Sequence, residues 1–95
     1  MNRKQAQSTL QIEDNRVKVT RWDFSPNSET GWYTHQMNYI VVPLTNGTLT
    51  AELPDGSLTE SELTIGSTYS RPRGVSHNII NSNNDEFSFI EIELK

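Results

Sequence analysis

Polar and hydrophobic residues alternate along most of this chain. The segment VKVTRWDF (17–24) places Val17 and Val19 on one face of a strand and Trp22 and Phe24 on the other. A period of two residues is the pattern of a β-strand with one buried face. The pattern predicts strands over residues 17–24, 32–37, 38–44, 48–53, 57–63, 75–81 and 87–94.

Turn-forming residues separate these segments. Clusters of Gly, Pro, Asn and Asp lie at 26–31, 45–47, 54–56 and 82–85. No window of about eleven residues has the pattern of an amphipathic helix. Short strands joined by such turns are typical of an all-β sandwich or barrel. Residues 1–7 are polar, so we expect a flexible N-terminus followed by a single domain over 8–95.

The chain has few apolar residues for its length. Hydrophobic residues make up 33% of the 95 positions, which predicts a small core. The first strand segments, residues 8–24, carry apolar side chains on both faces. A strand that packs on a neighbouring subunit, or is exchanged with one, has this pattern. We therefore expect a homodimer.

Charge and composition exclude several classes of function. The net charge is −4 and the basic residues are scattered, so no basic stripe is available for nucleic acid. The absence of cysteine excludes disulfides and thiolate catalysis. No apolar run approaches the ~18 residues of a membrane span, and the first residues lack the apolar segment of a secretion signal. We expect a cytoplasmic protein with neither nucleic acid nor a membrane as partner.

Two segments carry candidate chemistry at fixed spacings. The second half has a run of turn-forming and polar residues, namely Gly66, Pro72, Gly74, His77 and Asn81. Glycine permits a bend without a Cβ clash, and proline stiffens it. The first half contains TGWYTHQMNYIVVPLTNG (30–47), which includes the other histidine of the chain, His35.

The second-half residues resemble the second motif of the cupin superfamily: Gly, five residues, Pro-x-Gly, two residues, His, three residues, Asn. Every fixed position is present. The first cupin motif reads Gly, five residues, His-x-His, three or four residues, Glu, six residues, Gly. Laid on this chain it falls on Asn27, Tyr33-Thr34-His35, Ile40 and Gly47, so three of its five fixed residues differ. The resemblance covers about residues 20–94 and implies a cupin-type double-stranded β-helix, which is a jelly-roll barrel.

The resemblance also implies a metal position in the barrel mouth. Similar cupins hold the ion with two histidines and a glutamate from the first motif and a histidine from the second. Here His35 and His77 remain, Ile40 offers no ligand, and Tyr33 is a third ligand only as a phenolate. A divalent transition metal (Zn, Ni, Fe, Mn or Cu) is one reading. The other is a pair of buried, neutral, hydrogen-bonded histidines without an ion.

We expect a ligand pocket at the same place, lined by Tyr33, His35, Met37, Ile40, Arg71 and His77. Arg71 and Arg73 are either solvated loop charges or a clamp for a carboxylate. Glu91 and Glu93 share a face of the last strand with Phe87 and Phe89. The usual position of such a pair is in solvent, and an inward glutamate would be a substitute metal ligand.

These features leave three functional hypotheses. The first is a small cupin of unassigned specificity that binds a small molecule in the barrel mouth beside a degenerate metal site. The second is a metal-dependent isomerase, lyase or oxygenase that acts on a small polar substrate. The third is a non-catalytic interaction module. Cupins span all of these roles, so the fold alone does not choose among them.

Overall fold

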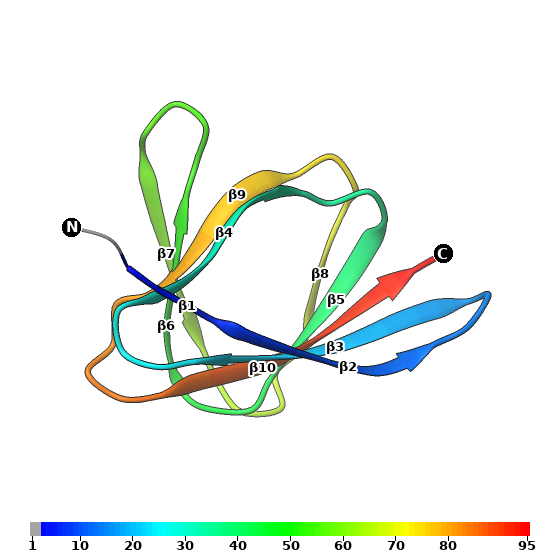
Figure 1. Cartoon of the computed structure of the whole chain (residues 1–95), viewed down its shortest axis with the longest axis horizontal. Coiled ribbons are helices and arrows are strands. Elements are labelled where there is room, and N and C mark those ends of the chain that lie inside the picture. The colour runs from blue at the N-terminus through cyan, green and yellow to red at the C-terminus, as the bar shows by residue number, and fades with distance from the viewer. Residues whose placement is uncertain (1–2) are drawn as a thin grey trace.

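Ten strands form two five-stranded sheets in the computed structural model, which describes residues 3–95 (Figure 1). The strands are β1 (Lys4–Gln5), β2 (Gln7–Glu13), β3 (Val17–Phe24), β4 (Ser28–Thr34), β5 (Asn38–Pro43), β6 (Gly47–Glu52), β7 (Leu58–Leu63), β8 (Tyr69–Arg71), β9 (Ser76–Asn81) and β10 (Phe87–Leu94). The strand order is β1-β4-β9-β6-β7 in one sheet and β2-β3-β10-β5-β8 in the other. The prediction of an all-β fold is confirmed, and the strands form two facing sheets as a jelly roll requires.

Most of the predicted strands are present within a residue or two of their expected ends. The main difference is β4, which was expected over 32–37 and instead spans Ser28–Thr34. A register shift between Glu29 and Trp32 in its pairing with β9 brings Gly31, at a φ of 87°, into the strand. The chain leaves the sheet after Thr34, so His35 lies at the start of the connection to β5 rather than inside a strand.

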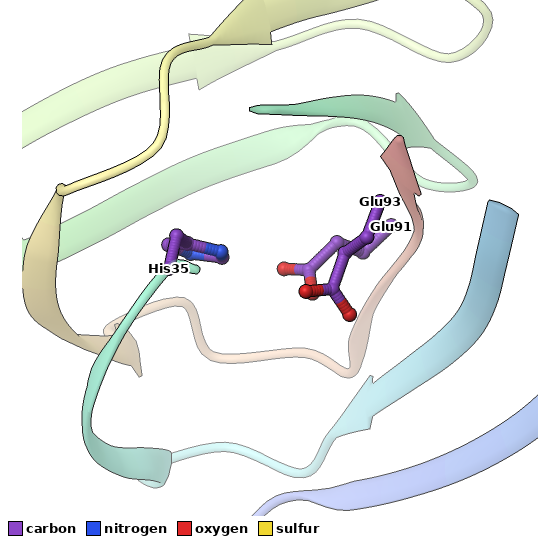
Figure 2. Close-up of side chains that lie close together, drawn as sticks. All are labelled: His35, Glu91 and Glu93. Atoms are coloured by element: carbon purple, nitrogen blue, oxygen red, sulfur yellow. The ribbon is translucent and has the colours of Figure 1, made fainter. Parts of the chain in front are cut away.

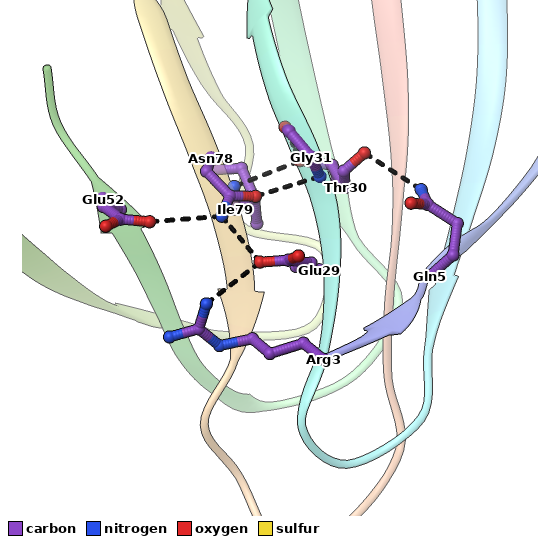
Figure 3. A network of polar contacts seen from close by, with 8 residues as sticks. All are labelled: Arg3, Gln5, Glu29, Thr30, Gly31, Glu52, Asn78 and Ile79. Atoms are coloured by element: carbon purple, nitrogen blue, oxygen red, sulfur yellow. Dashed lines mark hydrogen bonds and ion pairs between the residues drawn. The ribbon is translucent and has the colours of Figure 1, made fainter. Parts of the chain in front are cut away.

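The polar N-terminal segment includes a short strand, β1. Residues 1 and 2 lie outside the described part of the chain, but β1 pairs with β4 in parallel. Arg3 Nη1 donates to Glu29 Oε1 at 3.0 Å, and Gln5 Nε2 donates to the Thr30 carbonyl at 2.9 Å (Figure 3). Ala6 is 5% exposed and lies where the chain passes from one sheet to the other. Strand pairing, these two hydrogen bonds and the burial of Ala6 together hold this polar segment against β4.

The core lies between the two sheets. Phe24, Phe87 and Phe89 are almost fully buried, with ring centroids 5.5–6.2 Å apart. Aliphatic residues of β5, β6 and β9 complete this cluster. Strand alternation therefore assigns the inner face of β10 to Phe87, Phe89 and the residues that follow them at steps of two.

Asn81, the last residue of the second motif, has a structural role. Its side chain is 1% exposed. Its Nδ2 lies within 3.2 Å of three backbone carbonyls, those of Phe24, Ser25 and Asp85, and its Oδ1 accepts a hydrogen bond from the backbone N–H of Asn83. One amide thus joins the turn after β3 to the turn before β10. Among residues 3–95, no helix is long and apolar enough to cross a membrane.

Candidate functional site

Two cavities open on either side of the histidine pair. The first, the main cavity, has a volume of about 300 Å³ and lies between the sheets. Its lining is mostly aromatic and aliphatic, with a few polar groups: Tyr33, Tyr39, Val41, Leu49, Ala51, Leu53, Thr59, Ser61, Tyr69, Arg71, Val75, His77, Ile79, Phe89 and Glu91. The second cavity, of about 510 Å³, is bordered by His35, Met37, Trp22, Glu91 and Glu93 among others. Tyr33 and Glu91 border both cavities.

The two motifs bring the histidines together through backbone contacts. Tyr33 on β4 is the register partner of His77 on β9. The His35 N–H donates to the Val75 carbonyl at 2.9 Å, and the Gly74 N–H donates to the His35 carbonyl at 2.8 Å. Gly74 has a φ of 94°, a conformation that favours glycine. The glycine bend of the second motif therefore holds the backbone of the first-motif histidine.

The imidazoles are in direct contact. His35 Nε2 lies 3.1 Å from His77 Nε2, and the Tyr33 hydroxyl lies 3.3 Å from the same His77 atom. His35 also stacks on Tyr39, with ring centroids 3.7 Å apart. A protonated Tyr33 can donate to His77 Nε2, and so can a His35 that carries its proton on Nε2. His77 Nε2 has a single lone pair, so the two donors compete for it or share it.

Burial keeps both histidines neutral. It lowers the pKa of His35 to about 4, with a further contribution from the neighbouring His77, and it lowers the pKa of His77. Burial and the charge of Glu91 raise the pKa of Tyr33 above the usual range of a phenol. Burial also raises the pKa of Tyr39 to about 12. Neutral imidazoles are the form that binds a metal, whereas neutral phenols are poor ligands.

The carboxylates of β10 face this site, contrary to the solvent-facing position expected for them. Glu91 is 5% exposed, and Glu93 is half-buried. One ligand atom each from His35, Glu91 and Glu93 lie within 4.8 Å of one another. Figure 2 shows the His35 ring pointing toward the two carboxylates. Burial, with a smaller contribution from Glu93, raises the pKa of Glu91 to about 7.

The structure differs from the predicted pocket at Ile40. Tyr39 and Val41 line the main cavity and are 4% and 2% exposed, so Ile40 lies on the opposite face of β5. The expected register is off by one residue. The inward side chain at this point is Tyr39, which matches the shorter of the two spacings to the motif glutamate.

The other predicted pocket residues border one cavity or both. Tyr33, Arg71 and His77 line the main cavity, while His35 and Met37 line the second. The Arg71 guanidinium lies 4.5 Å from the centroid of the Tyr69 ring. The prediction omitted Tyr39, Tyr69 and Glu91. For Glu91 the signal was available, because Phe87, Phe89 and Glu91 are two residues apart and share one face.

The residues that the cupin motifs assign to a metal do not form a complete ligand set here. Tyr33 and the inward Tyr39 replace two of the four ligands, and both phenols keep their protons. Two imidazoles are fewer than the three protein ligands that a zinc or iron site normally has. Glu91 and Glu93 offer the oxygen donors that the first motif lacks.

No family model matches the sequence, but individual proteins do. The chain is 45% identical over 93 residues to the β-alanine degradation protein BauB of Pseudomonas aeruginosa, covering 98% of this chain and 97% of that protein. It is 53% identical to a cupin domain from Bordetella pertussis Tohama I of known crystal structure. The TM-score is 0.95, with 100% of this chain and 98% of the other covered.

More distant structures share the fold alone. A cupin-family protein from Methanocaldococcus jannaschii with a double-stranded β-helix superposes with a TM-score of 0.78 at 15% identity, covering 96% of this chain and 81% of that one. The complete second motif, the jelly-roll topology and these similarities agree with one another. The chain belongs to the cupin superfamily, as a small single-domain member whose second motif is complete and whose first motif is degenerate.

Proposed function

We propose that this cupin binds a short-chain carboxylic acid in its main cavity. The observation that supports the proposal is the lining of that cavity: aromatic and aliphatic walls, with Arg71 as a cation at the edge. Ligand sites combine a mostly apolar surface with a few polar groups that fix the orientation of the ligand. A guanidinium is well suited to pair with a carboxylate.

The name of the BauB relative supports the same class of ligand. β-Alanine is a short amino acid with a free carboxylate, and BauB is named for its degradation. We propose that this chain has a role in the breakdown of β-alanine or of a related short acid. A metal-dependent enzyme is the second candidate, favoured by the two carboxylates that lie beside the histidine pair.

The test is calorimetric titration, in the presence of a chelator, with β-alanine, propionate and the corresponding amides. We expect the acids to bind more tightly than the amides, because only the acids can pair with Arg71. Arg71→Ala is expected to weaken acid binding by about tenfold or more, since a hydrogen bond to a charged group contributes roughly 1.5–3 kcal/mol.

Arg73→Ala is the matched control. Arg73 is an exposed residue two positions further along the chain and does not border the main cavity. Its replacement is expected to leave acid binding unchanged. Equal binding of acids and amides, or equal losses in the two arginine variants, would contradict the proposal.

A further inference from the structure

We propose that the main cavity recognises a short amino acid with a terminal amine, whose carboxylate pairs with Arg71 and whose ammonium group pairs with the buried carboxylate of Glu91. The inference rests on the proposed binding of a short acid and adds a second subsite, which recognises the amino end of that acid. Glu93, two residues further along β10, adds negative charge to this subsite.

The main cavity offers one group of each charge. Of the described residues that line it, Arg71 is the only Lys or Arg and Glu91 is the only Asp or Glu. Within residues 3–95, these two side chains do not form an ion pair with each other. The Arg71 Nη1 instead donates to the Ser70 carbonyl at 2.9 Å. A ligand that carries both charges would complement both side chains.

The distance across the sheet suits a short molecule. Arg71 on β8 and Glu93 on β10 are both register partners of Tyr39 on β5. Two strand spacings separate β8 from β10, which is roughly 10 Å. In β-alanine the nitrogen and the carboxylate carbon are about 4 Å apart in the extended form. With a charge-assisted contact of about 2.8 Å at each end, such a molecule bridges roughly 10 Å.

The carboxylate of Glu91 has no cation of its own. The residue is 5% exposed, and no hydrogen-bond donor of residues 3–95 reaches its carboxylate. Lys18 borders the second cavity together with Glu91 and Glu93, but it forms no ion pair with either within the described chain. A buried carboxylate without a partner is destabilising unless a proton or a cation neutralises it. An alkylammonium group supplies that charge together with three N–H donors.

The other groups around this subsite are compatible with a cation. The rings of Tyr33, Tyr39 and Tyr69 line the same cavity, and the face of an aromatic ring attracts an ammonium ion. Burial lowers the pKa of both His35 and His77, so neither imidazole carries a charge that would repel the ligand. The subsite therefore combines a buried carboxylate with uncharged aromatic walls.

Four ligands separate the two subsites in calorimetric titrations of the full-length protein. β-Alanine carries both charges, propionate carries the carboxylate, β-alaninamide carries the ammonium group, and propionamide carries neither. Chelator is present throughout, so that no metal ion neutralises the carboxylates. The titrations are made at pH 8, above the pKa of about 7 of Glu91. We expect β-alanine to bind at least about tenfold more tightly than propionate, and β-alaninamide more tightly than propionamide.

Variants assign the preference for amines to the carboxylates. Glu91→Gln keeps the shape of the side chain and is expected to weaken β-alanine and β-alaninamide by at least about tenfold. It should bind propionate at least as tightly as the parent does, because a repulsive charge is gone. Glu93→Gln, at a half-buried position, should weaken the same two amines by a smaller factor. Glu60→Gln, exposed on β7, is the matched control and should bind all four ligands as the parent does.

Arg71→Ala separates this inference from the proposed binding of an acid. The variant should lose affinity for the two acids and still prefer each amine to its counterpart without an amino group. Acids that bind no more tightly than amides, with an amine preference that is lost in Glu91→Gln, would support the ammonium subsite and contradict the acid proposal.

The opposite results would overturn the inference. Circular dichroism first verifies that each variant is folded. A parent protein that binds β-alanine no more tightly than propionate would show that no ammonium subsite exists, whereas binding of propionate would still support the acid proposal. A folded Glu91→Gln variant that keeps the full preference for amines would also refute the role given to Glu91.

Discussion

At the scale of single residues, the fixed positions of the second motif have different physical roles. Gly74 and Val75 hold the backbone of His35, while His77 provides an imidazole to the site. Asn81 contacts neither histidine, and its two N–H groups are shared among three backbone carbonyls. A complete second motif therefore indicates the fold as much as it indicates a functional site.

Asn81→Ala is expected to be strongly destabilising. The substitution removes a buried donor from the Phe24 and Asp85 carbonyls, whereas the Ser25 carbonyl keeps Ser28 as a donor. We therefore expect a loss of about 1–3 kcal/mol in the free energy of unfolding. Urea denaturation measures it. Asn84→Ala, at an exposed position of the same turn, is the control and should change the stability by less than about 0.5 kcal/mol. Similar denaturation midpoints for the two variants would be inconsistent with the role given to Asn81.

The buried carboxyl of Glu91 should make the stability of the metal-free protein depend on pH. Burial raises its pKa from 4.5 to about 7 in the folded state. Because the folded pKa is the higher one, this contribution to stability is fully present below about pH 4.5 and is lost as the pH rises through about 7. Glu91→Gln removes the effect. With chelator present, the variant should exceed the parent by less than about 1 kcal/mol near pH 5 and by about 3 kcal/mol at pH 8.

The histidines do not obscure this comparison. The pKa of His35 is lowered to about 4, so its contribution is present above about pH 6.5 and is lost as the pH falls through about 4. Parent and variant both carry His35. Its contribution therefore cancels when the stability of one protein is subtracted from that of the other. Chemical denaturation of both proteins at the two pH values provides the measurement. A stability difference that is the same at pH 5 and pH 8 would contradict the expected ionisation of Glu91.

At the scale of elements, the N-terminal crossing joins the two sheets. β1 belongs to one sheet and β2 to the other, and Ala6 is the buried residue between them. The side chains of Arg3 and Gln5 fix β1 against β4 from the outside (Figure 3). The Arg3–Glu29 ion pair is solvent-accessible, so it is expected to contribute little. Most of the stabilisation from this segment should come from Ala6 and the strand pairing.

Ala6→Asp tests this assignment. A charged side chain would be buried at the crossing without a partner, and we expect the free energy of unfolding to fall by about 2 kcal/mol or more. Gln7→Asp, at the next and exposed position, is the control and should have a small effect. Thermal melting of the two variants gives the comparison. Equal melting temperatures would mean that the segment before β2 adds nothing to the fold.

At the scale of the whole molecule, β2 exposes apolar side chains that a second copy of the chain could cover. All seven of its residues are exposed, including Leu10 at 55% and Ile12 at 52%. A register shift between these two residues turns them to opposite faces of the sheet. β2 is also one of the two edge strands of its sheet. Exposed edges with apolar side chains favour pairing or packing with another chain.

We therefore expect a homodimer in which β2 contacts the second copy. Light scattering at tens of micromolar protein should return about twice the 10.8 kDa mass of one chain. Ile12→Lys should shift the protein toward the monomer, because a lysine at the contact would be buried without a partner. Gln11→Lys, on the same exposed strand, is the control and should remain dimeric. A parent protein that scatters as a monomer would refute the expectation.

The strand pattern and the fold class could be predicted from the sequence because both depend on local, periodic features. Alternation in segments such as 17–24 and 87–94 defines strands whatever they pack against. The glycines and the proline of the second motif mark a bend through backbone sterics alone. The two histidines were found in the same way, by their spacing from those turns.

Tertiary structure decided which side chains face the site. A shift of one residue reverses the face of a strand, so Tyr39 and Ile40 were equally compatible with the motif spacing until β5 was placed against β10. The inward position of Glu91 and its raised pKa likewise depend on burial by both sheets. By itself the sequence determined most of the strands, the bends and the histidine pair. The packing of the two sheets alone placed the carboxylates of β10 beside those histidines, because burial and register are properties of strand neighbours that lie far apart in the chain.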